Sequence, residues 1–177
     1  MSAIISIPCL TTTERIAIRL AALNDCAPEA AFFQFRRCCG SSKWAEQMVK
    51  VRPFASLEDV ERYADYVWAG CSTQDLLEAF AAHPRIGEQC DSQWSRQEQS
   101  GSSALTRAVK KELAGANKRY EARFGYIFII SAAGKSTTDM LAILEERLDN
   151  DPREEIHIAA EQQRLITRLR LRKLMSQ

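Results

Sequence analysis

The sequence predicts an all-α protein: a single compact multi-helix domain covering residues 1–177, with one short extended segment near residues 126–132. Helix-start signals recur along the chain, and each is followed by apolar residues three or four positions apart, the spacing of one helix face. The only strongly β-favouring run covers residues 126–130. A lone strand would have no partner, so we expect this run to be a buried extended segment.

The helices of the first half are marked at both ends. Thr11 and Glu14 have capping-box spacing, and Pro28 fits the first turn of the next helix. Further starts carry hydroxyl side chains that can accept hydrogen bonds from a first turn: Ser42, Ser56 and Ser72 or Thr73. The matching ends carry glycine or proline: Gly40, Pro53, Gly70 and Pro84.

Three helical patterns make up the second half. Apolar residues keep helical spacing over residues 105–124. Thr137 or Thr138 is expected to cap the next helix. Asp151 and Pro152, followed by an acidic first turn, start a last helix that runs nearly to the end of the chain.

The composition limits the classes of partner. Apolar residues make up 46% of the chain, which is enough for a core. With 24 basic and 23 acidic residues, the net charge of +1 argues against nucleic acid or an anionic membrane as the partner. No apolar run is long enough to span a bilayer. The six cysteines show no CxxC spacing and no secretory leader is seen, so we expect free thiols in a cytoplasmic protein.

His83 is the first candidate for acid–base chemistry. It follows a helix and precedes Pro84, and a proline disfavours the α conformation for the residue before it. We therefore expect the ring at a helix–loop junction, where it can project into a cleft. A histidine in this position can also be a cap or a hydrogen-bonded core group. The second histidine, His157, lies inside the last helix between two isoleucines.

The segment from Ser95 to Gln99 is the second candidate. Ser95 and Glu98 have capping-box spacing, so the segment can simply start a helix. Free N–H groups at a helix start, with the Glu98 carboxylate and the Gln99 amide, also suit a ligand that has N–H donors and carbonyl acceptors, as urea-like groups do. The two interpretations are compatible.

Arginines near the C-terminus are the third candidate. Arg164, Arg168 and Arg172 recur every four residues and form one stripe, which we expect to be a solvated face. Arg170 stands off that stripe between two leucines, so we expect it to point inward. An inward arginine needs a carboxylate partner or an anionic ligand.

Five motifs occur in order along almost the whole chain. They are His83-Pro84-x-Ile86-Gly87, Ser95-x-x-Glu98-Gln99-x-Gly101, Asn117-x-x-Tyr120-x-x-x-Phe124-Gly125-Tyr126-x-Phe128, Arg147-Leu148-x-Asn150 and Arg170-Leu171-x-x-Leu174. Each motif is weak alone, but together they are specific. The set resembles the OHCU decarboxylases, which act on 2-oxo-4-hydroxy-4-carboxy-5-ureidoimidazoline.

The resemblance implies an all-helical homodimer that uses no metal and no organic cofactor. It implies a lyase of urate degradation that converts a small anionic ureidoimidazoline into (S)-allantoin. His83 would be the catalytic acid/base, with Glu98 and Arg170 as essential catalytic partners. The backbone of residues 128–132 would hold the substrate ring, and the full implied substrate-binding set is Pro84, Ser95, Glu98, Gln99, Phe128, Ile129, Ile130, Ser131 and Ala132.

Two positions depart from the family pattern, and other functions remain open. Arg85 stands where family members often carry an acidic residue, and Ala133 stands where many carry arginine. One alternative is a helical binding module that kept the fold and lost the reaction. Another is a decarboxylase for a related ureido acid. A metal-dependent hydrolase is disfavoured, because the chain has two histidines and no HExxH motif.

Overall fold

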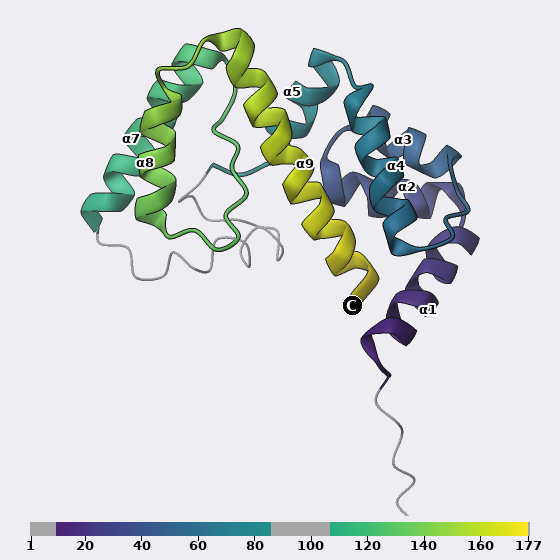
Figure 1. Cartoon of the computed structure of the whole chain (residues 1–177). Helices are drawn as coiled ribbons and strands as arrows, with labels where there is room; N and C mark the ends of the chain where they lie inside the picture. Colours follow the sequence, from purple (N-terminus) through teal and green to yellow (C-terminus); the bar gives the residue numbers. More distant parts are fainter. Residues whose placement is uncertain (1–9, 86–106, 177) are drawn as a thin grey trace, which may run out of the picture.

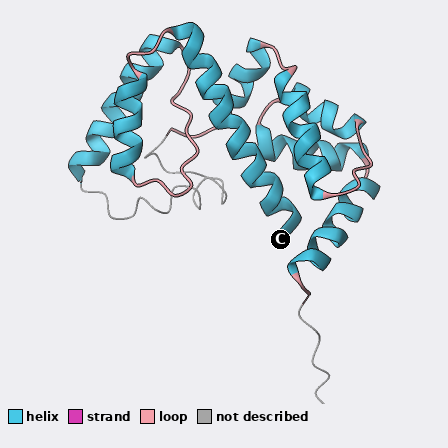
Figure 2. Cartoon of the chain, viewed as in Figure 1, coloured by secondary structure: helices cyan, strands magenta, loops and turns pink. Residues whose placement is uncertain are grey.

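The computed structural model describes residues 10–85 and 107–176. Within these ranges every regular element is a helix (Figure 2), which confirms the predicted all-α class. In chain order the helices are α1 (Thr12–Asp25), α2 (Pro28–Cys39), α3 (Ser42–Lys50), α4 (Leu57–Ala69), α5 (Thr73–Ala81), α7 (Arg107–Phe124), α8 (Thr137–Arg147) and α9 (Pro152–Ser176). None of these described helices is both long and apolar enough to cross a membrane.

The long helix α9 connects two groups of helices (Figure 1). It packs against α1, α2, α4 and α5, which belong to what we call the N-terminal group (α1–α5). On its other side α7 and α8 lie next to each other and form the C-terminal pair. The segment that joins α7 to α8, drawn in green, runs back between this pair and α9 (Figure 1).

Aromatic side chains form much of the core of the N-terminal group. Phe35 lies edge-on to Trp44 and near-perpendicular to Phe54, and all three side chains are buried. The Trp44 indole N–H donates to the carbonyl of Ala64, which ties α3 to α4. Because a buried indole N–H needs an acceptor, this bond helps to fix the position of α4 in an otherwise apolar core.

Several predicted helix starts are confirmed. The side chains of Thr11, Ser56 and Ser72 accept hydrogen bonds from the first turns of α1, α4 and α5. Pro28 occupies the first turn of α2, as its fixed φ predicted. These local signals were sufficient because a cap depends on residues within one helical turn.

Two starts lie one residue before the predicted cap. Ser41 caps α3, while the neighbouring Ser42 donates through both its N–H and its hydroxyl to the Glu78 carboxylate of α5. Ser136 caps α8, one residue before the predicted threonines, because Asp139 completes a capping box with it. In the first case a contact with another helix decides the outcome, and spacing within the chain could not show it.

The arginine stripe of α9 faces α4, and of its three residues only Arg172 is exposed, so the prediction of a solvated face is correct only in part. Arg164 pairs with Asp65 at 2.8 Å, Arg168 contacts both Asp65 and Glu61, and Arg172 bonds to Glu61. Two acidic residues one turn apart on α4 thus meet three arginines one turn apart on α9. Periodicity identified the stripe, but it could not show which helix lies opposite.

Candidate active site

A close approach between α2 and α5 determines where His83 lies. The helix α5 ends at Ala81, and the His83 N–H donates to the Phe80 carbonyl at 3.1 Å. Gly40 follows α2 with a φ of +91°, and a Cβ there would lie 2.7 Å from the Cβ of Ala82. A side chain at this position would strain the backbone and displace the end of α5. The glycine therefore lets the end of α5 settle against α2.

The His83 ring is hydrogen-bonded to α9. Its Nε2 lies 2.7 Å from Oε1 of Gln163, a residue that is fully buried. The Gln163 Nε2 donates to the carbonyl of Cys39 at 3.1 Å and to the hydroxyl oxygen of Thr167 at 3.2 Å. His83 itself is half-buried. The ring thus lies at a helix–loop junction, as one interpretation expected, and is hydrogen-bonded to a buried side chain, as the other expected.

Arg170 lies on the same face of α9 as Gln163. They are seven positions apart, which is close to two full helical turns, and both side chains are buried. The prediction that Arg170 points inward is confirmed. Its positive charge acts on Cys38 and Cys39 at the end of α2, two free thiols whose pKa burial raises to about 12. Gln163 and Arg170 therefore both face the C-terminal end of α2.

The extended segment, residues 126–132, is held from both sides. The carbonyl of Ile129 accepts a hydrogen bond from Arg147 of α8 at 2.9 Å, and the N–H of Ser131 donates to Oε1 of Gln162 at 3.0 Å. Ala132 is half-buried, and the other predicted substrate-binding positions here are buried: Phe128, Ile129, Ile130 and Ser131. No strand forms at these residues, as expected.

A buried polar network fixes this segment. Glu155, in the first turns of α9, is fully buried and accepts hydrogen bonds from Arg147 at 2.8 Å, from Asn150 at 2.6 Å and from the Tyr120 hydroxyl. The Arg147 guanidinium also lies over the Phe128 ring, 4.6 Å from its centroid. Burial and the bond to Glu155 raise the pKa of Tyr120, so its hydroxyl remains a donor. Two motifs that carried the family resemblance thus have a structural role here.

Arg85, which departs from the family pattern, forms an ion pair with an acidic side chain. Arg85 follows the half-buried Pro84 and makes a two-pronged ion pair with Glu121 of α7, at 2.8 and 3.1 Å. An acidic residue at position 85 would face Glu121 with like charge. The pair connects the end of α5 to the C-terminal pair. Ala133, the second departure, is exposed.

Three predicted site residues, Ser95, Glu98 and Gln99, lie outside the described residues, and their roles stay predictions. Within the described ranges the structure brings His83, Arg170 and the extended segment to α9. In the same ranges, no group of three or more His, Cys, Asp or Glu side chains is placed to hold a metal ion.

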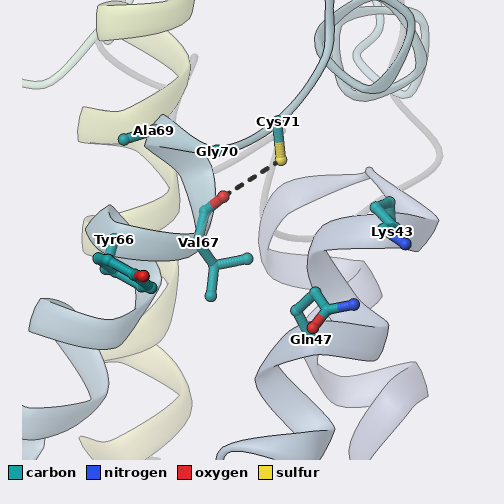
Figure 3. A pocket seen from close by; sticks show the side chains of 7 residues that line it. All are labelled: Lys43, Gln47, Tyr66, Val67, Ala69, Gly70 and Cys71. Carbon is teal, nitrogen blue, oxygen red and sulfur yellow. Dashed lines mark hydrogen bonds between the residues drawn. The ribbon is translucent and has the colours of Figure 1, made fainter.

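A surface pocket lies between α3 and α4 (Figure 3). Inside it the Cys71 thiol donates to the Val67 carbonyl at 3.5 Å, and burial raises the pKa of this thiol to about 11. The lining residues are Lys43, Gln47, Tyr66, Val67, Ala69, Gly70 and Cys71. Because no predicted site residue lines this pocket, we place the candidate active site at the inner face of α9 instead.

Comparison with known proteins agrees with the motifs and the fold. The OHCU decarboxylase family profile matches residues 24–172, which is most of the chain. The chain belongs to the OHCU decarboxylase family. It is similar in structure to an OHCU decarboxylase crystallised in the presence of (S)-allantoin, with a TM-score of 0.74 and 38% identity, over 86% of this chain and 100% of that one.

Two relatives in sequence show how far the similarity extends. The chain is 41% identical over 151 residues to the uric acid degradation bifunctional protein TTL of Arabidopsis thaliana, covering 81% of this chain and 47% of that protein. It is 28% identical over 134 residues to the 2-oxo-4-hydroxy-4-carboxy-5-ureidoimidazoline decarboxylase of Halalkalicoccus jeotgali, covering 74% and 73% of the two chains. This family member thus spans about half the length of the bifunctional protein.

Sequence reasoning missed the residues of α9 that hold the site together in this OHCU decarboxylase family member. Gln162 and Gln163 contact the extended segment and the His83 ring, and Glu155 organises the buried network. One signal was available: Gln163 falls on the apolar face that Ala159 and Ile166 define, and a polar residue there needs a buried partner.

Proposed function

We propose that this chain decarboxylates 2-oxo-4-hydroxy-4-carboxy-5-ureidoimidazoline to (S)-allantoin, without a cofactor. The observation that carries the proposal is the position of His83. Its ring sits at the end of α5 and is bonded to the buried face of α9 that also presents Arg170. A proton donor bonded to this helix face and a fixed cation on the same face suit an anionic substrate that must lose CO2 and gain a proton.

The reaction needs an electron sink and one directed proton. The carbon that loses CO2 also carries a hydroxyl group, and the electron pair left by the broken C–C bond can enter the conjugated C=N and carbonyl groups of the ring. His83 contacts the hydroxyl or the carboxylate and then protonates the adjacent ureido-bearing carbon from one face. The carbon that lost CO2 becomes a ring carbonyl as its hydroxyl proton passes to the ring nitrogen of the former C=N bond. Delivery from one face accounts for a chiral product.

The remaining predicted residues bind and orient the substrate in this proposal. Arg170 anchors the carboxylate or a ring oxygen, and Glu98 holds the imidazole or the ureido N–H groups, with Pro84, Ser95 and Gln99 alongside. The Ile129 carbonyl and both the N–H and the carbonyl of Ser131 already have side-chain partners. We therefore assign the ring contacts to the remaining backbone groups of residues 128–132.

The proposal includes a homodimer in the cytoplasm. Its support is the resemblance to the family and, for the location, the expectation of free thiols, which holds for the four cysteines of the described residues. Light scattering on the purified chain measures the oligomeric state directly, and a monomer would remove the dimer from the proposal.

The test is an assay that resolves the enantiomers of allantoin. The unstable substrate is generated in situ from urate, and the circular dichroism of the product is followed with and without the protein. His83→Ala is expected to lower kcat by about 100-fold or more, the usual contribution of general acid–base catalysis. His157→Ala is the matched control, because this second histidine is exposed on α9.

Two results would contradict the proposal. Full activity of a folded His83→Ala variant would remove His83 as the acid/base. A wild-type protein that binds the substrate but does not accelerate formation of (S)-allantoin would instead be the helical binding module. Activity on a related ureido acid with none on this substrate would change the substrate but keep the reaction.

A further inference from the structure

We propose that Gln163 is a positioning residue that keeps a proton on Nε2 of the His83 ring, so that the ring exchanges its proton with the substrate at Nδ1. This inference rests on the proposed function for the role of the exchanged proton. The other part of the inference, that the neutral His83 ring is the Nε2–H tautomer, is independent of any reaction.

The orientation of the Gln163 amide follows from its neighbours. The Cys39 carbonyl, 3.1 Å from Nε2, can only accept a hydrogen bond. The Thr167 hydroxyl, 3.2 Å from Nε2, uses its own hydrogen to bond the Gln163 backbone carbonyl at 2.9 Å, so it too must accept. Reversing the amide would place Oε1 against two acceptors. Both neighbours therefore require the NH₂ group on their side.

The fixed amide determines the state of the histidine. Because the NH₂ group is directed to Cys39 and Thr167, Oε1 is the atom that faces His83, at 2.7 Å from Nε2. A carbonyl oxygen can only accept, so Nε2 must carry the hydrogen. Gln163 is fully buried, so solvent does not reach the acceptor side of this bond.

The consequence for the chemistry concerns the other ring nitrogen. In the cationic ring both nitrogens carry protons, and the Nδ1 proton is the one that Gln163 does not hold. When CO2 leaves, the electron pair of the broken C–C bond moves into the conjugated ring of the substrate, and the adjacent ureido-bearing carbon takes up this Nδ1 proton as a new C–H bond. The His83 ring is left as the neutral Nε2–H form, which keeps its bond to Gln163. Nδ1 is then reprotonated from solvent before the next turnover.

Nitrogen-15 NMR of the histidine rings tests the tautomer on the protein without substrate. The chain has only two histidines, and exposed His157 serves as an internal reference for a ring in water; His157→Gln assigns the two signals. At a pH where both rings are neutral, we expect His83 to be wholly in the Nε2–H form, with a slowly exchanging Nε2 proton. His157 should show the solvent mixture and fast exchange. Nδ1–H as the main form of His83 would overturn the proposal, even if no variant folds.

Gln163→Met tests the functional half, because methionine keeps the length of the side chain but offers no carbonyl acceptor. The His83 signal should move toward that of His157, and kcat should fall about 10- to 100-fold, as when an outer partner of a functional histidine is lost, while KM changes little. Thr167→Val alters the same buried cluster but leaves the Gln163 contact with the ring, so it should keep the Nε2–H signal.

Three outcomes separate the possibilities. A folded Gln163→Met protein with unchanged kcat would overturn the positioning role. Equal loss of the Nε2–H signal in Thr167→Val would also overturn it, since general loosening of the core would then suffice. If His83→Ala is fully active while the wild-type ring is wholly Nε2–H, the catalytic role of His83 fails but the tautomer assignment holds.

Discussion

The N-terminal group and the C-terminal pair differ in the balance of contacts around α9, although hydrogen bonds from α9 reach both regions. In the N-terminal group, side chains such as Phe35, Trp44 and Leu23 form an apolar core, with ion pairs at its edge. The C-terminal pair is joined to the start of α9 through Glu155, which is fully buried and bonded to Arg147 and Tyr120.

The difference reflects what each region has to position. Apolar burial is not directional, so it stabilises the helices but tolerates small shifts between them. Hydrogen bonds and a buried ion pair fix particular atoms. Here they fix the carbonyl of Ile129, in the extended segment proposed to hold the substrate ring. The buried ion pair of Arg147 and Glu155, which is costly to desolvate, occurs where the backbone of the extended segment must be held in place.

The largest effect is expected from breaking the buried ion pair. Glu155→Gln leaves the Arg147 guanidinium buried without its counter-charge, and such a change typically costs about 3–5 kcal/mol. The free energy of unfolding in urea measures it. The double variant Glu155→Leu with Arg147→Met should lose less than the sum of the single variants. A single-variant cost below about 1 kcal/mol would mean that this region is held by apolar packing after all.

A smaller effect is expected at the polar edge of the N-terminal group. Burial alone would raise the pKa of Glu61, but hydrogen bonds from Arg172 and Arg168 outweigh it and hold the pKa below its ordinary value. The ionised form is thus favoured by folding. Glu61→Gln should cost about 1.5–3 kcal/mol at neutral pH, the range for hydrogen bonds to charged groups.

The sign of the pH dependence follows from the lowered pKa. The stabilisation is complete well above the unfolded-state pKa of about 4.3 and is lost as the pH falls through the folded-state value. The difference in unfolding free energy between wild type and Glu61→Gln should therefore shrink below about pH 4. A difference that grows as the pH falls would show that the Glu61 carboxylate is not stabilised by its arginines.

The smallest effect is expected from a conservative change in the apolar core. Phe35→Leu removes part of a ring that packs against Trp44 and Phe54, and it should cost about 1 kcal/mol because the surrounding apolar side chains can adjust. The proposed allantoin-forming activity should stay near the wild-type rate. A loss of activity without loss of folded protein would show that this core also positions the site, and the contrast between the two regions would weaken.

Sequence analysis predicted the features of this molecule that depend on residues close together in the chain, and it missed those that depend on residues far apart. Caps such as Thr11 and Ser72, and the inward direction of Arg170, depend on spacing within one helix, and sequence reasoning found them. Contacts between helices were not accessible in this way. Arg168 and its partner Glu61 are 107 positions apart, and His83 and Gln163 are 80 positions apart. No local pattern encodes which helix lies opposite in either case.

Gln162 and Gln163 are consecutive, and in an α-helix neighbouring side chains project about 100° apart with an offset of only about 1.5 Å along the axis. One peptide unit of α9 therefore specifies the separation between the imidazole and the segment that contains Ser131. Inserting or deleting a residue just before this dipeptide would rotate both side-chain amides together. A residue inserted between Gln162 and Gln163 would instead change the position of one amide relative to the other. Changes in the length of surface loops elsewhere leave the spacing between the Gln162 and Gln163 side chains unchanged.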